Sequence, residues 1–251
     1  MATSVLSSIS RFGLTEPVDL QIARGQITGH STVNIYGFQV SVTTTNIPIW
    51  ESASAYTYPV AATAMNLAST VNTGSDLSGT TILIQGLDAN YNPISETLAL
   101  TGTTVAVTTK SYFRINSLQV TAGAPTGTIT LKNLANSVTY AHINPSLGRS
   151  QMAIYTVPAG FTFYLSRVDA YTSANGSTAD WVQYRNVATT ASGVTTLSQQ
   201  APFSNNYHAQ RVMPRPFAEK TDIQLQAKTS ANTYAVSIAA EGYLIQNNGQ
   251  A

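Results

Sequence analysis

The sequence has no cysteine and very little charge. The absence of cysteine excludes disulfides, thiolate metal ligands and cysteine nucleophiles, and it leaves the redox state of the compartment open. Lysine, arginine, aspartate and glutamate make up only 9% of the 251 residues, whereas an ordinary soluble domain has roughly 25%. Because surface charge keeps a free monomer soluble, we expect much of this surface to lie against neighbouring subunits.

Basic clusters, long apolar runs and a secretion signal are also missing. A net charge of +1 without any lysine or arginine cluster gives no electrostatic footprint for nucleic acid. No apolar run approaches the roughly 20 residues of a membrane-spanning helix, and residues 1–14 lack a basic segment followed by an apolar core. We therefore expect a protein that is made in the cytoplasm, is not exported by the usual route, and has neither a membrane nor a nucleic acid as partner.

Residue patterns of the common enzymes and metal sites do not occur. None of His30, His142 and His208 has a second histidine or a carboxylate at the i+2 to i+4 spacing of a metal site. The G-x-S-x-G, H-E-x-x-H and P-loop patterns are absent. A Ser/His/Asp triad assembled from distant residues stays open, because such triads are defined by geometry. We predict no enzyme activity, no catalytic residue, no cofactor and no metal ligand.

One stretch resembles the beginning of a calcium loop. Asp88, Asn90 and Asn92 fall at alternate positions. A loop of the EF-hand type needs glycine at its sixth position and glutamate at its twelfth, but these positions hold Pro93 and Ala99. The flanking runs are rich in β-branched and apolar residues, so we predict a hairpin whose turn is built from Asn and Asp. A weak calcium site is the alternative.

Short strands separated by turn residues account for most of the chain. Threonine, tyrosine and β-branched residues fit a pleated surface, and regular strand spacing without a helical period indicates a sandwich or small barrel. Only residues 61–70 offer a short helix, and Gly242 indicates a bulge or bend. Pro214 and Pro216 indicate a stiff loop at 214–222. The predicted strands are residues 40–45, 80–85, 94–100, 103–109, 112–121, 127–133, 152–157, 161–171, 179–188, 221–228 and 233–246.

The first forty residues differ from the rest, because their apolar residues follow no sustained period. We predict an all-β protein in three parts: an extended N-terminal arm (1–40), a β-sandwich or small barrel (41–145) and a jelly-roll-like β-sandwich (146–251). The arm, with one short strand at 19–23, is expected to dock on a neighbouring subunit or on its own domain. Residues 1–38 should then be dispensable for folding. Its apolar anchors are Phe12, Leu14, Leu20, Ile22, Ile27, Ile35, Tyr36 and Phe38.

Aromatic residues at 50 and 56–59 could line a sugar-binding groove, or they could pack in a core or interface. Sugar sites combine a stacking ring with polar partners, and the YTYPVAATAM stretch has no Asn, Gln, Asp or Glu. We therefore expect Trp50, Tyr56 and Tyr58 to be packed or intersubunit, and Trp181 to lie in the core. The candidate interface residues are Phe12, Leu20, Ile22, Arg24, Ile35, Tyr36, Phe38, Trp50, Tyr56 and Tyr58.

Two carboxylates, Glu96 and Asp169, fall inside predicted strands. A glycosidase needs two facing carboxylates, but a strand carboxylate is also explained by a solvated sheet face or by a pair with Arg114 or Arg167. We favour the second explanation.

Four stretches together resemble a group of virion structural proteins of tailed bacteriophages, mainly those of marine bacteria and cyanobacteria. They are residues 22–37, 84–104, 152–160 and 216–233. The resemblance implies a non-enzymatic particle component that is made late in infection. We expect a capsid decoration (cement) protein that binds the major capsid protein, associates with itself, for example as a trimer, and is located in the virion. The alternatives are a tail adaptor, knob or fibre-like component, and a module that binds host glycans.

Overall fold

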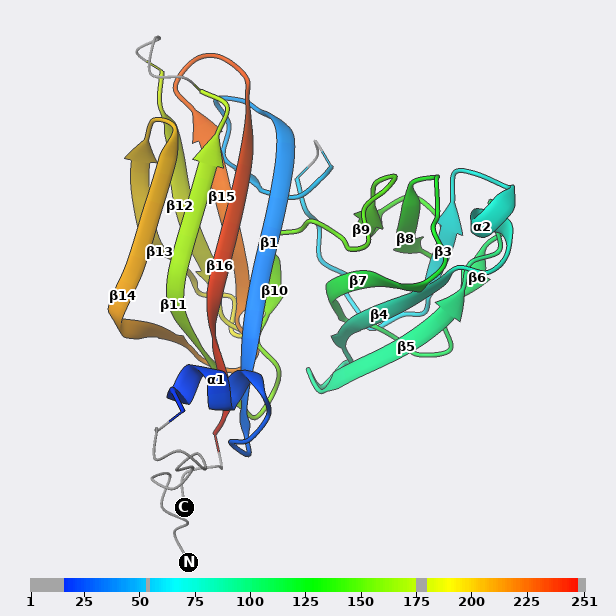
Figure 1. Cartoon of the computed structure of the whole chain (residues 1–251), viewed down its shortest axis with the longest axis horizontal. Helices are drawn as coiled ribbons and strands as arrows, with labels where there is room; N and C mark the ends of the chain where they lie inside the picture. The colour runs from blue at the N-terminus through cyan, green and yellow to red at the C-terminus, as the bar shows by residue number, and fades with distance from the viewer. Residues whose placement is uncertain (1–15, 53–54, 175–179, 248–251) are drawn as a thin grey trace, which may run out of the picture.

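The protein is built almost entirely from antiparallel β-sheets. The computed structural model describes residues 16–52, 55–174 and 180–247. These residues form sixteen strands and two short helices, and the strands form four sheets. Figure 1 shows the sheets gathered into a larger block and a smaller block that lie side by side. The predicted all-β class is confirmed.

The larger block holds two sheets that share one hydrophobic core. One sheet has the strand order β1-β16-β11-β14; the other has the order β10-β15-β12-β13, with β2 also beside β15. The core is filled from both sheets, for example by Phe163, Tyr184 and Ile238, because alternate side chains of a strand point to the same face. The strands are His30–Val42 (β1), Ile47–Pro48 (β2), Ile154–Thr156 (β10), Phe161–Thr172 (β11), Val182–Thr189 (β12), Thr195–Phe203 (β13), Asn206–Phe217 (β14), Asp222–Thr229 (β15) and Tyr234–Gln246 (β16).

The smaller block is inserted between β2 and β10. Its two sheets have the orders β6-β3-β8-β9 and β5-β4-β7, and they share a second core that includes Met65, Ile84 and Leu118. Its elements are Met65–Ser69 (β3), Gly74–Leu77 (α2), Thr81–Leu87 (β4), Pro93–Ala99 (β5), Ala106–Val107 (β6), Arg114–Ala122 (β7), Ile129–Asn133 (β8) and Thr139–Ile143 (β9).

Two segments connect the blocks, and side chains of both alternate between the two cores. Ile49 packs in the larger core and Trp50 in the smaller one; Tyr155 and Ile154 divide in the same way. Both segments approach β1 at Gly37. A Cβ atom there would lie 2.1 Å from the Ile49 carbonyl oxygen and 2.5 Å from the Ala153 nitrogen, so only glycine permits this approach.

Several predicted elements are confirmed. The strands expected on either side of the Asp88 turn are β4 and β5, which pair along their whole length. Strands β7, β8, β10, β11, β12, β15 and β16 overlap the runs predicted from residue 112 onward. Around Gly242 the register shift lies in the neighbouring strand, between Leu165 and Arg167 of β11. A Cβ at Gly242 would lie 2.1 Å from the Tyr164 carbonyl oxygen, so the glycine accommodates the irregularity of β11.

Two local predictions near the N-terminal side are wrong. Residues 61–70 contain strand β3 and no helix, since Met65 and Leu67 are fully buried and the strand pairs with β8. Tertiary pairing therefore overrides the helix propensity of the alanines there. The strand expected at 19–23 is a helix, Val18–Ala23 (α1), which follows Pro17 and buries Ile22.

The segment expected to form an extended arm contributes a strand to the larger block. Residues 30–42 form β1, which pairs with β16, and Ile35 is only 3% exposed in the larger core. Removing residues 1–38 would therefore remove most of β1. The expectation that these residues are dispensable for folding is contradicted by this pairing.

The sequence also missed the hairpin of β13 and β14. Pro214 and Pro216 lie inside β14, where a loop was predicted. Each of these two strands pairs on one side only, β13 with β12 and β14 with β11. A proline is tolerated in such an edge strand, because its missing N–H faces no partner.

Candidate assembly surface

Half of the ten predicted interface residues lie inside the chain. Ile22, Ile35, Trp50 and Tyr56 are buried, and Tyr58 packs against the core of the smaller block. A partner could contact little of these side chains. Phe12 lies outside the described residues.

The other predicted interface residues are more accessible. Tyr36 is 38% exposed and Phe38 is half-buried, and both belong to β1. Leu20 and Arg24 lie at α1. The Arg24 Nη1 atom is 2.5 Å from Glu16 Oε1. The structure therefore separates the predicted set into core residues, residues of β1 and residues near α1.

The aromatic residues around Trp50 form a packed cluster. Tyr56 meets the Trp50 ring edge to face at 5.2 Å between centroids, and Tyr58 meets Tyr56 at 5.0 Å. The prediction that these rings are packed is confirmed, and they offer no exposed platform for a sugar. The prediction for Trp181 is wrong. Trp181 is half-buried, because β12 begins at Val182 and its core-facing side chains start there.

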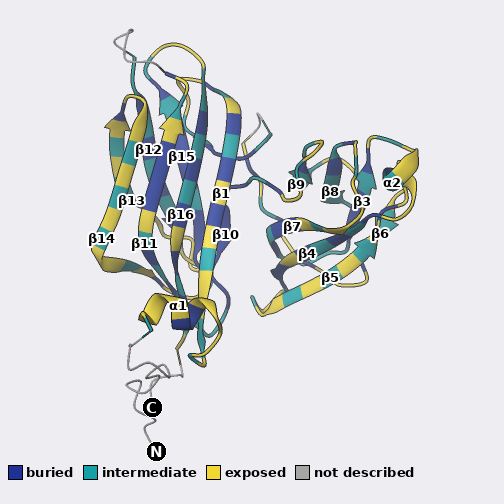
Figure 2. Ribbon diagram, in the orientation of Figure 1, coloured by how far each residue is buried: buried dark blue, intermediate teal, exposed yellow. Residues whose placement is uncertain are grey.

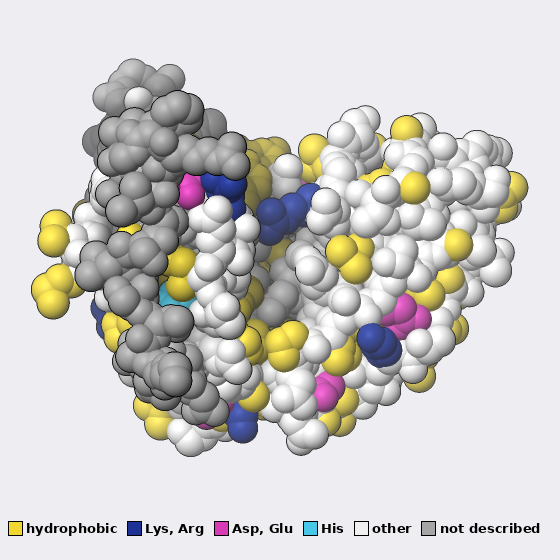
Figure 3. All heavy atoms as spheres, turned by 60° about the horizontal axis from the view of Figure 1, so that its bottom comes forward, with side chains coloured by type: hydrophobic (Ala, Val, Ile, Leu, Met, Phe, Trp, Pro, Cys, Tyr) yellow, Lys and Arg dark blue, Asp and Glu magenta, His cyan; other side chains and the backbone are white. Residues whose placement is uncertain are grey.

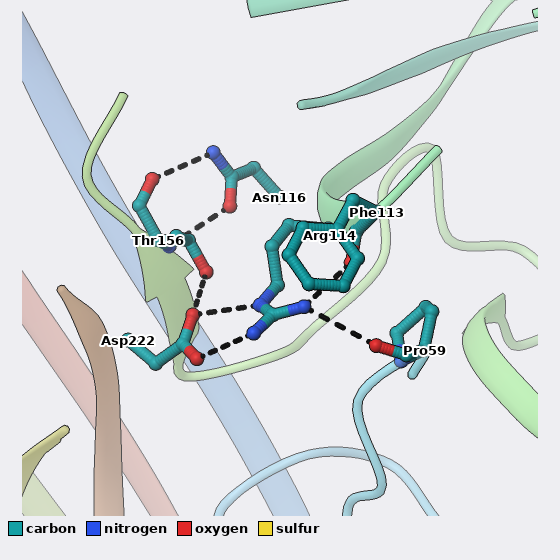
Figure 4. Close-up of polar contacts among 6 residues, drawn as sticks. All are labelled: Pro59, Phe113, Arg114, Asn116, Thr156 and Asp222. Atoms are coloured by element: carbon teal, nitrogen blue, oxygen red, sulfur yellow. Dashed lines mark hydrogen bonds and ion pairs between the residues drawn. The ribbon is translucent and has the colours of Figure 1, made fainter. Parts of the chain in front are cut away.

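A buried ion pair joins the two blocks (Figure 4). Arg114 of β7 donates from Nε to Asp222 Oδ1 at 2.8 Å and from Nη2 to Oδ2 at 2.9 Å. Thr156 of β10 donates its hydroxyl to Asp222 Oδ1 at 2.6 Å. Two parallel hydrogen bonds fix the planes of both groups. The pair therefore sets how β7 of the smaller block lies against β10 and β15 of the larger block.

Aromatic rings surround the Arg114 guanidinium. Its Cζ lies 4.1 Å from the Phe113 ring centroid, 4.6 Å from that of Tyr58 and 5.6 Å from that of Tyr91. Burial alone lowers the pKa of Arg114, but the hydrogen bonds and charge of Asp222 outweigh burial and raise this pKa. Arg114 thus stays charged, and its partner is Asp222 instead of the strand carboxylates considered from the sequence.

Those two strand carboxylates have other partners. Glu96 accepts hydrogen bonds from the Thr109 and Lys110 backbone nitrogens at 2.9 and 3.1 Å. Asp169 lies between Arg167, whose Nε is 2.7 Å away, and His208, whose Nδ1 is 2.6 Å away. The predicted Asp169–Arg167 pair is confirmed. Among the described residues, no serine hydroxyl is hydrogen-bonded to a histidine ring.

The Asp88 loop is a turn in which the Asp88 carboxylate accepts hydrogen bonds from the turn itself. Asp88 Oδ1 accepts from the backbone nitrogens of Asn90 at 2.8 Å and Asn92 at 2.9 Å, and Oδ2 accepts from the Asn92 side chain at 3.1 Å. Slight burial raises the pKa of Asp88, but these hydrogen bonds outweigh it and lower the pKa. The predicted hairpin turn is confirmed. In the described parts of the chain, no group of three or more His, Cys, Asp or Glu side chains could hold a metal ion.

A polar pair is buried where the connecting segments meet the smaller block. His142 Nε2 lies 3.8 Å from Glu51 Oε2, and Asn144 donates to Glu51 Oε1 at 2.9 Å. The His142 ring lies 5.7 Å from that of Trp50. Burial lowers the pKa of His142 and raises the pKa of Glu51, so burial disfavours the charged form of each group.

A cleft of about 390 Å³ lies between the blocks. Arg149 lines it and donates to the Asn34 carbonyl oxygen at 2.9 Å. Among the described residues of its lining there is no aspartate, glutamate or histidine, the side chains that often act as general acid or base.

The outer face of the β1-β16-β11-β14 sheet carries two of the predicted interface residues, Tyr36 and Phe38. One row across its four strands is Tyr36, Ala239, Asp169 and His208; the next is Phe38, Ser237, Tyr171 and Asn206. Figure 2 shows exposed and half-buried segments alternating along these strands, while α1 crosses one end of the face. Below, this surface is called the outer sheet face.

The outer sheet face exposes large aromatic and aliphatic side chains. Val40 is 66% exposed and Tyr171 is 47% exposed. Arg167 and Asp169 form an ion pair on it, and His208 Nδ1 lies 2.6 Å from Asp169 Oδ1. Protein interfaces are enriched in aromatic residues, and this face carries Tyr36, Phe38 and Tyr171.

Comparisons with known proteins give only distant structural likeness. No protein-family model and no curated protein matches the chain. The chain is similar to the structure of the infectious bursal disease virus Gt strain, with 12% identity over 88% of this chain and 71% of that chain and a TM-score of 0.21. It is also similar to the crystal structure of the T13 particle of this virus, with 12% identity, 88% and 70% coverage and a TM-score of 0.24. Of the helices in the described residues, none is long and apolar enough to cross a membrane.

Proposed function

We propose that the larger block is a jelly roll with the smaller block as an insertion. Apart from the two-residue strand β2, the described residues of the block form eight strands, of which the first pairs with the last (β1 with β16), the second with the seventh (β10 with β15), the third with the sixth (β11 with β14) and the fourth with the fifth (β12 with β13). This pairing winds one long antiparallel ribbon into two facing sheets, as in the jelly rolls of capsid and lectin domains.

We propose that the protein is a non-enzymatic structural component of a virus particle. A jelly roll hosts several functions, so the fold alone does not decide. The observation that carries the proposal is the outer sheet face, which presents Tyr36, Val40 and Tyr171, and on which Arg167 and Asp169 form an ion pair. A surface of this kind gains free energy when a partner removes it from water. The low charge of the whole chain and its resemblance to virion proteins of tailed phages support the same proposal.

Within the particle, we propose the role of a capsid decoration protein that binds the major capsid protein. A shell component makes many symmetry-related contacts, so a moderate contact per subunit suffices. A tail adaptor, knob or fibre would use the same surface at far lower copy number, and copy number separates the two roles. A glycan-binding role is less favoured, because Trp50, Tyr56 and Tyr58 are packed in the smaller block.

Two valine variants test the proposal. Val40→Glu places a charge on the outer sheet face, where Val40 is 66% exposed; Val107→Glu places one on β6 of the smaller block, where Val107 is 51% exposed. We expect purified virus particles to contain wild-type protein and the Val107 variant in equal amount, and to lack the Val40 variant, as measured on a quantified gel. If both variants are incorporated like the wild type, the outer sheet face is not the assembly surface. If wild-type protein is absent from purified particles, the virion role is wrong.

A further inference from the structure

Strand β14 carries a bulge that projects from the edge of the larger block. Leu165 of β11 pairs with Arg215 and Arg167 pairs with Gln210, so residues 211–214 face the single residue Ser166. Val212 is 100% exposed and Met213 is 84% exposed. Figure 3 shows hydrophobic side chains projecting from this edge of the molecule. A single exposed apolar residue is ordinary, but here two adjacent apolar residues on a projection are almost fully exposed.

Two arginines flank these apolar residues without any acidic partner. Arg211 donates to the Gln199 side chain and Arg215 donates to the Ser198 carbonyl oxygen, both on β13. Neither arginine forms an ion pair within the described residues. The bulge, residues 211–215, therefore combines an apolar tip with two cations that lack a counter-charge.

A pocket with the opposite charge lies where α1 crosses the outer sheet face. It has a volume of about 270 Å³, and its lining residues are Asp19, Thr32, Val33, Asn34, Ser166, Glu241, Gly242 and Tyr243. Asp19 accepts a hydrogen bond from the Tyr243 hydroxyl at 2.6 Å. Neither carboxylate is in an ion pair within the described ranges. The pocket thus offers two carboxylates without a cationic partner among the residues described, which complement the charge of the two arginines of the bulge.

We propose that the bulge of one copy binds the pocket of a second copy of this chain. Val212 and Met213 would displace water from the pocket, which has room for several water molecules at about 30 Å³ each. The adjacent arginines would then face Asp19 and Glu241, and complementary charge fixes the register of such a contact. The flexible thioether of Met213 suits an irregular pocket.

This inference rests on the proposed function, since it names a second copy as a partner of the outer sheet face. Each copy has one bulge and one pocket. The contact therefore closes either by reciprocal exchange in a two-fold dimer or as a ring of copies.

Sedimentation velocity of the full-length chain over a concentration series tests the contact. We expect wild-type protein to associate and Met213→Asp to weaken association by at least about tenfold. Met213→Lys loses the same apolar group but carries the charge that the pocket favours, so it should weaken association much less. Glu241→Lys combined with Met213→Asp should restore association. Val60→Asp is the matched control, because Val60 is 97% exposed in the loop before β3, and it should associate like the wild type.

Three results would each overturn the inference: a monomeric wild-type chain at every concentration, equal effects of Met213→Asp and Met213→Lys, or no rescue by Glu241→Lys. These results are distinct from failure of the proposed function. Copies that associate through the bulge but are missing from purified particles would refute the virion role alone. A chain found in particles whose Met213→Asp variant still associates would refute the bulge contact alone.

Discussion

The buried Arg114–Asp222 pair should stabilise the protein strongly, and Asp222→Asn tests this. The two side chains are only 10% and 11% exposed, so water replaces little of what the mutation removes. Asparagine keeps the shape and can still accept from Thr156, but it leaves the Arg114 charge buried and unpaired. Removing one partner of a buried pair costs about 3–5 kcal/mol, and we expect a loss of this size in the free energy of unfolding.

A double-mutant cycle separates the pair from its surroundings. The cycle consists of Arg114→Met, Asp222→Leu and the double variant, which replaces both charges by apolar groups, a change that is often close to neutral. The double variant should therefore be more stable than Asp222→Asn, although the Pro59 and Phe113 carbonyl oxygens lose their Arg114 donor. Equilibrium unfolding in urea, followed by fluorescence, measures each free energy.

The exposed pair of Arg24 and Glu16 is the control. Arg24 is 58% exposed at its side chain, and exposed pairs contribute about 0–1 kcal/mol, so Glu16→Gln should change stability little. If Asp222→Asn costs less than about 1 kcal/mol, or if the cycle gives a coupling energy below about 0.5 kcal/mol, the pair does not hold the two blocks together as described.

Four further predictions follow from single features of the fold. Gly37→Ala should lower the free energy of unfolding by about 1–3 kcal/mol through overpacking, because its Cβ would lie 2.1 Å from the Ile49 carbonyl oxygen. Gly148→Ala is the control: a Cβ there would have no atom within 4 Å, so urea unfolding should change little. Deleting residues 1–38 removes most of β1 and should abolish the cooperative thermal transition; a truncated chain that melts like the wild type would contradict the pairing of β1. The melting temperature should not respond to calcium or chelator, because the Asp88 carboxylate already accepts hydrogen bonds within its turn. A calcium-dependent rise of several degrees would instead support a calcium site in this loop. Burial depresses the pKa of His142, so the stability that neutral His142 contributes is lost as the pH falls below the pKa of about 6.5 that histidine has in the unfolded chain. The melting temperature of His142→Phe should therefore fall less between pH 7 and pH 5.5 than that of the wild type.

Local patterns were sufficient to predict the hairpin and several core strands. The Asp88 turn is specified by residues that bond within it, and β4 and β5 are its direct continuations. Strands β11 and β15 alternate apolar and polar residues, so their inward faces are visible in the sequence. The packed state of Trp50 and Tyr58 also followed from local composition, because few polar residues surround them.

The features that the sequence missed depend on contacts between distant residues. β1 contains glycine and polar residues, a composition that suggested an extended arm. It is a strand because it pairs with β16, which lies some two hundred residues later in the chain. β13 and β14 are edge strands with mostly exposed residues, so no buried alternation marks them. The sequence offered several carboxylates as partners of Arg114, and the actual partner, Asp222, is 108 residues away along the chain. The outer sheet face joins residues of four strands, and no single segment shows it.

A cryo-EM map of purified virus particles tests the virion role most directly. We expect density for this chain at many symmetry-related positions on the shell, with Tyr36, Val40 and Tyr171 of the outer sheet face covered by a neighbouring subunit. Particles without this chain, or a chain bound with that face open to solvent, would contradict the proposed function.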